Sequence, residues 1–433
     1  MSDDREYGEV DEDTFDRYVR YAFRPTAGPP DEASTDEASG GDEGGDDADE
    51  GTGGEGSTDD ATDEAEPDED GPEVERFDRG LYRPDREDPV AVAGYHDFRT
   101  RVRGEYVRVG GVTLVATPPE HRRQGHVREL MRRMLEEFHE EGIHLSALWP
   151  FKRSFYRRLG WETGSRYVRI EAPPEQLRSA GADGGGEFHP TAADDWERLV
   201  PIHEAHDAGC GLHVDRTEAW WRGRVFEGWG SDPYVYRWED DGGEPRGYLT
   251  YTVDDGDDGR VLRVYEAAWA DGLARRQLLR FLGDHDSQVE TVRLPAPLDP
   301  AFPTLETTED PSSVTVEVEA GHAVRLTDVA NGLSALSYPE ETSDDLRIEV
   351  LDPLVDANDG TFRLSVDGGR AECSPAAGDP AVSLGVGRLS QLAVGYRDAP
   401  AMVAAGDLDA PADAVARLDV LFPAEPVWLR EGF

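Results

Sequence analysis

The residues best suited to chemistry lie in one basic turn and in one tyrosine further along the chain. An apolar run that ends in Val115, Ala116 and Thr117 leads into the turn, and apolar residues at helical spacing follow it. The turn itself consists of Arg122, Arg123, Gln124, Gly125, His126, Val127 and Arg128. Free backbone N–H groups at a helix start attract anions, and a glycine lets the backbone approach them closely. We therefore expect this turn to hold a pyrophosphate group.

Tyr156 is the candidate for moving a proton beside that anion site. A phenol keeps its proton at neutral pH, because its ordinary pKa is near 10, and it can donate that proton to a stronger base. The tyrosine follows the turn within the segment that runs from Phe155 to Trp161. The alternative is a buried structural tyrosine that packs beside Phe155 and Leu159.

The elements that must position these residues form an α/β arrangement. We expect strands at 89–95, 105–109, 112–117, 143–148 and 167–170, a helix at 126–141 and a short helix at 150–158. The order strand, turn, helix, strand predicts a right-handed crossover between parallel strands. An apolar stripe also predicts a helix over 9–24, with Asp13 or Thr14 as its cap.

The composition is strongly acidic and poor in lysine. The net charge is -49, from 93 acidic and 44 basic residues, and Lys152 is the single lysine. Such a balance indicates adaptation to concentrated salt, where charge repulsion is screened; the alternative is simply an acidic protein with a disordered insert. The acidic balance argues against a nucleic-acid partner and against an anionic membrane surface. The sequence has no apolar run of about 18 residues, the first residues lack the apolar core of a secretory signal, and Cys210 and Cys373 make no disulfide framework. We expect a cytoplasmic protein.

Two segments interrupt the α/β pattern. Residues 26–72 form an acidic, low-complexity insert without lysine or arginine, which we interpret as a disordered loop; a partner-binding acidic segment is the alternative. Residues 173–187 are rich in proline, glycine and alanine and indicate a linker. His203, His206, Cys210 and His213 have metal-like spacing. Their surroundings indicate an ordinary helix instead, and we expect no metal.

The turn and the Phe155–Trp161 segment together resemble the GNAT family of N-acetyltransferases, and more narrowly its Eis ("enhanced intracellular survival") group. Arg122 and Gly125 fit the fixed positions of the family's pyrophosphate motif, whereas Val127 replaces its last small residue. The resemblance implies two tandem GNAT domains and a C-terminal sterol-carrier-protein-like α+β domain. We expect these domains at 1–172, 188–312 and 313–433. The turn of the second domain, Asp271–Arg276, lacks the motif, so we expect that domain to be degenerate.

The resemblance also implies roles for individual residues. Acetyl-CoA is the expected co-substrate, with its pyrophosphate on the N–H groups of Arg123 to Arg128. Val115, Ala116 and Thr117 should pair with its pantetheine arm, and Phe151 and Lys152 should border the far side. Tyr156 matches the general acid of the Eis group, and the α-carboxylate of Phe433 matches its general base. An ordinary chain end would instead be frayed.

The implied function is acetyl transfer to a primary amine, such as an aminoglycoside-like polyamine, a lysine side chain or another small amine. The implied assembly is a homohexamer. The competing hypothesis is a non-catalytic protein that binds an apolar small molecule or lipid in its C-terminal domain and carries vestigial GNAT domains.

Overall fold

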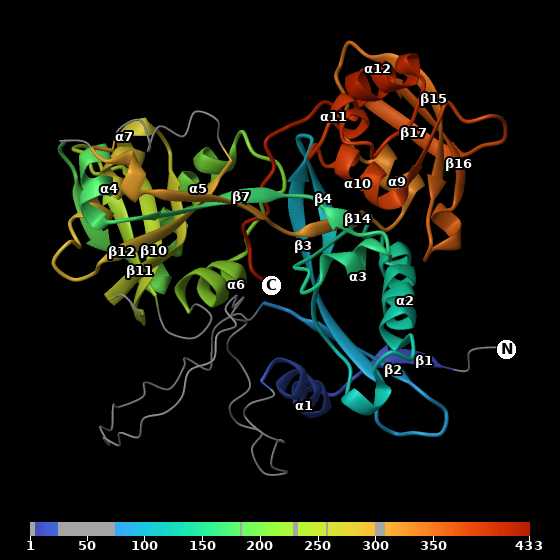
Figure 1. The fold of residues 1–433 in the computed structure, drawn as a ribbon, viewed down its shortest axis with the longest axis horizontal. Helices are drawn as coiled ribbons and strands as arrows, with labels where there is room; N and C mark the ends of the chain where they lie inside the picture. The colour runs from blue at the N-terminus through green and yellow to red at the C-terminus, as the bar shows by residue number, and fades with distance from the viewer. Residues whose placement is uncertain (1–4, 25–73, 182–183, 228–232, 257–258, 299–307) are drawn as a thin grey trace.

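The computed structural model describes residues 5–24, 74–181, 184–227, 233–256, 259–298 and 308–433. The acidic insert predicted at 26–72 lies outside these ranges. The described residues form three sheets, each with helices packed against it, and Figure 1 shows them as three bodies around a central C-terminus. None of the helices in these ranges is long and apolar enough to cross a membrane.

The first sheet has the order β1-β2-β3-β4-β5-β14-β6. Its strands are β1 (Glu6–Glu9), β2 (Phe77–Tyr82), β3 (Ala91–Val102), β4 (Glu105–Ala116), β5 (Leu145–Leu148), β14 (Ala323–Leu326) and β6 (Glu162–Thr163). The helices that accompany it are α1 (Glu12–Phe23), α2 (His126–Glu140) and α3 (Arg153–Arg157). The helix predicted at 126–141 is confirmed, and β4 and β5 are parallel, as the crossover predicts. The cap of α1 differs from the prediction, since Asp11 accepts the hydrogen bond from the N–H of Thr14.

The second sheet has the order β13-β7-β12-β11-β10-β9-β8. Its strands are β13 (Thr315–Ala320), β7 (Arg166–Ala172), β12 (Thr291–Pro297), β11 (Gly259–Trp269), β10 (Pro245–Gly256), β9 (Tyr234–Glu239) and β8 (Glu187–Pro190). Helices α4 (Pro174–Ala180), α5 (Val200–Asp207), α6 (Glu218–Trp220) and α7 (Gly272–Gly283) belong to this body. Helix α4 corrects the expected linker at 173–187. A proline in the first turn of a helix leaves no needed N–H unsatisfied, so Pro174 begins this helix rather than preventing it.

The third sheet has the order β17-β16-β15-β18. It consists of β15 (Ser343–Leu351), β16 (Gly360–Asp367), β17 (Arg370–Pro375) and β18 (Val382–Gly385). Helices α9 (Val329–Ser334), α10 (Val386–Ala393), α11 (Ala399–Ala404) and α12 (Ala412–Leu421) accompany it. The apolar core of this body continues into the first sheet, because Leu326, Val324 and Ala147 belong to the same cluster as Leu364 and Leu389.

Two strands cross between the bodies. Strand β7, which we expected to complete the first domain, pairs with β12 and β13 in the second sheet. Strand β14, which follows the second sheet in the sequence, inserts between β5 and β6 of the first. These exchanges connect the first and second bodies through backbone hydrogen bonds rather than through side chains alone. The domain boundaries expected from the sequence stay a prediction.

Candidate active site

The basic turn leads directly into the start of α2. Gly125 precedes the helix with φ +82°, and no side chain caps the first turn. Arg123 also has a positive φ, of 61°, which folds the turn back on itself. The side chains of Arg122 and Gln124 hydrogen-bond to the carbonyls of Thr117 and Glu120. The side chains therefore brace the turn, while the first N–H groups of α2 have no intrahelical acceptor and are suited to an anion.

Strand β4 separates from β5 next to this turn. The parallel pairing of the two strands ends at Val112 and Leu148. Beyond this point β4 carries a bulge, with Leu114 at φ +50° and a register shift against β3. The last residues of β4, which include Val115 and Ala116, therefore have no ladder partner from β5. The buried hydroxyl of Thr117 also lacks a partner in the described structure. This end of β4 is the strand edge at which the sequence predicts contact with the pantetheine arm.

Aromatic side chains surround Tyr156, the predicted proton donor. The phenol of Tyr156 is only 3% exposed and lies between Phe151 and Trp161, with ring centroids 5.5 and 6.5 Å away. Burial raises the pKa of Tyr156 above its ordinary value. Phe151 itself is 70% exposed, and Lys152 is exposed beside it. Such an exposed aromatic ring next to a buried phenol is suited to covering an apolar part of a ligand.

The C-terminal segment is anchored rather than frayed. Its backbone pairs with Gly211, which donates to the carbonyl of Pro426 and accepts from the N–H of Trp428 at 2.8 and 3.1 Å. The Trp428 ring stacks on Tyr167 of β7. The carbonyl of Leu429 lies 3.1 Å from Nδ1 of His322. The tail thus runs between the first and second bodies, as Figure 1 shows by the position of the C-terminus beside α6 and β3.

A buried charge cluster, which we call the tail clamp, fixes the last residues. It comprises Arg216, Trp220, Glu266, Arg430 and Glu431. The Glu431 carboxylate accepts from Arg216 Nη2 at 2.7 Å and from Trp220 Nε1 at 2.9 Å. Arg216 also donates to both oxygens of Glu266, at 2.9 and 2.8 Å. Burial opposes ionisation of Glu266, but Arg216 and Arg430 together hold its pKa below the usual range. The charged groups of the tail clamp are therefore buried away from water, and each is paired with an opposite charge.

Phe433 lies against the first sheet at the place where β4 and β5 part. Its ring is 8% exposed and packs on Phe98 and His322, with centroids 5.1 and 5.0 Å apart. A Cβ atom on Gly111 would lie 2.8 Å from the Phe433 ring, so this position requires glycine. Gly111 pairs with Ala147, one residue before the last pair of the two strands.

Phe433 and Tyr156 lie on opposite faces of this sheet. Gly110 faces Phe138 of α2, and its neighbour Gly111 faces Phe433, because side-chain positions alternate along a strand. Tyr156 shares the apolar cluster on the α2 face with Val112 and Leu148. The first sheet therefore lies between the two candidate residues.

The second sheet contains the corresponding strand-to-helix turn in an altered form. Helix α7 follows β11 there, as α2 follows β4 in the first sheet. Asp271 caps α7, and its carboxylate accepts from the N–H groups of Leu273 and Ala274. A carboxylate already occupies the place where an anion would bind. This geometry agrees with the absence of the pyrophosphate motif from 271–276.

The histidines with metal-like spacing are engaged in other contacts. His203 lies 3.4 Å from the carbonyl of Val214, His206 accepts from the N–H of Trp269, and His213 lies 3.0 Å from the carbonyl of Cys210. Within the described ranges, no three or more His, Cys, Asp or Glu side chains lie together so that they could hold a metal ion.

Sequence reasoning missed the tail clamp and His322. Burial lowers the pKa of His322 to about 3, so its imidazole is neutral where it stacks on Phe433. One signal was present in the sequence, since Arg430 and Glu431 interrupt an otherwise apolar terminus that begins at Val427. Charged residues in such a segment indicate buried ion pairs.

Comparison with known proteins agrees with this architecture. Models of the GNAT acetyltransferase domain match residues 62–164 and 212–326, and the model of the sterol carrier protein domain matches residues 329–430. An uncharacterised N-acetyltransferase of Streptomyces coelicolor is 27% identical over 380 residues, which are 83% of this chain and 91% of the relative. The N-acetyltransferase Eis of Mycobacterium tuberculosis is 27% identical over 362 residues, 78% of this chain and 83% of Eis.

Solved structures share the same fold. A GCN5-related N-acetyltransferase from Kribbella flavida superposes with a TM-score of 0.67 at 27% identity, over 81% of this chain and 86% of that chain. A probable N-acyltransferase from Enterococcus faecalis has a TM-score of 0.78 over 99% of both chains, and at 17% identity it supports the fold alone. GNAT acetyltransferases use acetyl-CoA and an amine acceptor. This chain therefore carries two GNAT acetyltransferase domains followed by a sterol carrier protein domain, and it is similar to the Eis-like N-acetyltransferases over most of its length.

Proposed function

We propose that this enzyme transfers the acetyl group of acetyl-CoA directly to a primary amine, with Tyr156 as general acid and the α-carboxylate of Phe433 as general base. The acceptor class is an aminoglycoside-like polyamine, a lysine side chain or another small amine. The observation that carries the proposal is the burial of Phe433 over Gly111, where β4 and β5 separate beside the basic turn.

Binding of the co-substrate is assigned to the turn and the strand edge. The N–H groups of residues 123–128 hold the pyrophosphate, and the backbone of Val115, Ala116 and Thr117 pairs with the pantetheine arm. Phe151 and Lys152 border the arm on the other side. Acetyl-CoA supplies the activated acetyl group, and these residues fix where its thioester lies.

Two residues move protons in this reaction: Phe433 accepts one and Tyr156 donates one. A carbon–nitrogen bond forms to the acceptor amine and the carbon–sulfur bond breaks. The amine proton passes to the carboxylate of Phe433, directly or through one water molecule, and the departing sulfur receives a proton from Tyr156. Burial raises the pKa of Tyr156, so the phenol keeps its proton until the thiolate leaves. A thiolate that forms in the same desolvated surroundings is a stronger base than it is in water.

The test is a thiol-release assay with acetyl-CoA and a panel of amines in concentrated salt. Tyr156→Phe should lower kcat by roughly 10²- to 10⁴-fold, the range for general acid–base catalysis, and leave CoA affinity unchanged. Tyr82→Phe is the matched control, because the Tyr82 hydroxyl is bonded to the carbonyl of Glu9 far from the site. Binding of CoA without turnover on any amine would instead support the non-catalytic hypothesis.

The assembly and the location of the protein are part of the same proposal. By its resemblance to the Eis group, we propose a homohexamer, which light scattering on the purified enzyme tests directly. The cytoplasmic location expected from the sequence stays a prediction.

A further inference from the structure

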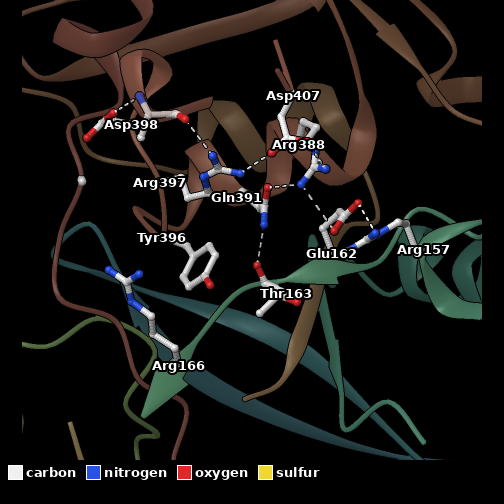
Figure 2. A pocket seen from close by; sticks show the side chains of 12 residues that line it. Arg157, Glu162, Thr163, Arg166, Arg388, Gln391, Tyr396, Arg397, Asp398 and Asp407 are labelled. Atoms are coloured by element: carbon white, nitrogen blue, oxygen red, sulfur yellow. Dashed lines mark hydrogen bonds and ion pairs between the residues drawn. The ribbon is translucent and has the colours of Figure 1, made fainter. Parts of the chain in front are cut away.

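A polar pocket of about 640 Å³ lies between the first sheet and the C-terminal body, apart from the proposed active site. Strand β6 and the start of β7 form one wall, and α10, α11 and the loop between them form the other (Figure 2). Four arginines and three carboxylates line it, namely Arg157, Arg166, Arg388, Arg397, Glu162, Asp398 and Asp407. Its size is in the range of sites that hold a nucleotide-sized molecule.

The charge balance of this pocket reverses that of the whole chain. The chain carries 93 acidic residues against 44 basic ones, so an average lining would hold about two acids for each base. The pocket instead has more arginines than carboxylates. An arginine excess in so acidic a protein points to a ligand of negative charge.

Every carboxylate in the lining is already engaged. Glu162 is shared by Arg157 and Arg388, at 3.0 and 3.5 Å. Asp407 is likewise shared by Arg388 and Arg397, at 2.6 Å each. Asp398 caps α11 by accepting from the N–H of Ala401. Glu162 and Asp407 therefore stiffen the walls by pairing with three of the arginines, and Asp398 is held by the backbone of α11.

Arg166 is the one lining arginine that pairs with none of these three carboxylates. Within the described ranges no ion pair involves it, and its guanidinium lies 5.7 Å from the centre of the Tyr396 ring. Figure 2 shows its side chain rising beside Tyr396, without the bonds that join the other arginines. Arg157 also has nitrogens to spare, because its pair with Glu162 uses Nε. Guanidinium groups with free N–H donors match the paired oxygens of phosphate and carboxylate groups.

We propose that this pocket binds a small organic anion with phosphate or carboxylate groups, held by Arg166 and Arg157 at the junction of the first sheet and the C-terminal body. Arg388 and Arg397 add positive charge from the fixed wall, and Tyr396 offers a ring against which the ligand packs. The site joins two bodies of the enzyme, so its ligand stabilises their arrangement.

The test is calorimetric titration of the full chain with ADP, inorganic pyrophosphate and citrate. Saturating CoA is present throughout, so that the turn at 122–128 cannot take up a probe. We expect at least one probe to bind once per chain. Binding of ADP or pyrophosphate identifies a phosphate ligand, and binding of citrate a carboxylate ligand. If none of the three binds, the proposal is wrong.

The variant Arg166→Ala should weaken that binding by roughly 10- to 100-fold, the effect of losing a hydrogen bond to a charged group. The matched control is Arg169→Ala, an exposed arginine on the same strand that pairs with Glu317 and Glu319 outside the pocket. It should leave the affinity unchanged. Thermal melting checks that both variants fold. Equal binding by Arg166→Ala and the unmodified chain would overturn the assignment.

Discussion

Neutralising one carboxylate of the tail clamp should detach the C-terminal segment. In Glu431→Gln the side chain keeps its size, but Arg216 loses the charge that accepts two of its hydrogen bonds, at 2.7 and 3.0 Å. Breaking a buried ion pair costs about 3–5 kcal/mol. Because Arg216 keeps both bonds to Glu266, and the amide oxygen of glutamine still accepts one bond, we expect about 2–3 kcal/mol. That loss corresponds to a roughly 30- to 150-fold increase in the undocked fraction of the tail.

Amide hydrogen exchange measures this equilibrium directly. The N–H of Trp428 donates to the carbonyl of Gly211, so its protection reports docking. In Glu431→Gln its protection should fall by the same roughly 30- to 150-fold. kcat/KM for the amine should decrease once the undocked tail is populated, and CoA affinity should stay constant.

The control is Glu425→Gln in the same tail. The Glu425 side chain is 36% exposed and lies 3.5 Å from the buried Arg103, whose guanidinium also donates to the carbonyls of Ala393, Leu392 and Pro423. Because Arg103 keeps these acceptors and Glu425 is open to solvent, we expect a loss of only about 1 kcal/mol, so protection should change by less than about fivefold. Unchanged protection of Trp428 in Glu431→Gln would refute the role of the clamp.

Two further perturbations test the turn and the buried histidines. Gly125→Ala should raise the KM for acetyl-CoA by about tenfold or more, because alanine disfavours φ +82° by about 1–2 kcal/mol. The control is Gly104→Ala, a glycine with φ +88° and equally open space around it. Equal effects of the two variants on the KM would contradict the assignment of the turn. The free energy of unfolding should fall as the pH drops below about 6.5, by up to roughly 1.4 kcal/mol per pH unit for each histidine that is buried neutral. The free energy falls because each unfolded histidine binds a proton that the folded chain excludes. In His206→Gln, chemical denaturation at several pH values should show a pH dependence of the unfolding free energy that is smaller by one proton. An unchanged pH dependence would contradict this explanation. Burial lowers the pKa to about 4 for His96 and His206 and to about 3 for His203 and His322.

Local patterns in the sequence were sufficient for the turn and its helix. The apolar spacing after Gly125 predicts α2, because it follows from neighbouring residues. The strands predicted at 105–109 and 112–117 are two parts of the single strand β4, because Gly110 and Gly111 continue the strand rather than ending it. The family resemblance then supplied the three-domain fold, which the comparisons confirm.

Long-range pairing could not be predicted in the same way. The hydrophobic pattern of residues 323–326 does not indicate that this strand inserts beside β5, because its partner strand lies far earlier in the chain. Helix α4 was mistaken for a linker, because proline and glycine are typical of both linkers and helix ends. The tail clamp joins Arg216, Glu266 and Glu431 across the chain, and single acids do not stand out among 93.

The most direct test of the proposed mechanism concerns the α-carboxylate of Phe433. A semisynthetic enzyme that ends in the carboxamide of Phe433 keeps the ring packing on Phe98 and His322 and removes only the charge. We predict that its kcat falls by roughly 10²-fold or more, the contribution of a general base, while its affinity for CoA is unchanged. Full turnover by the carboxamide enzyme would contradict the central claim that the terminal carboxylate accepts the proton of the amine.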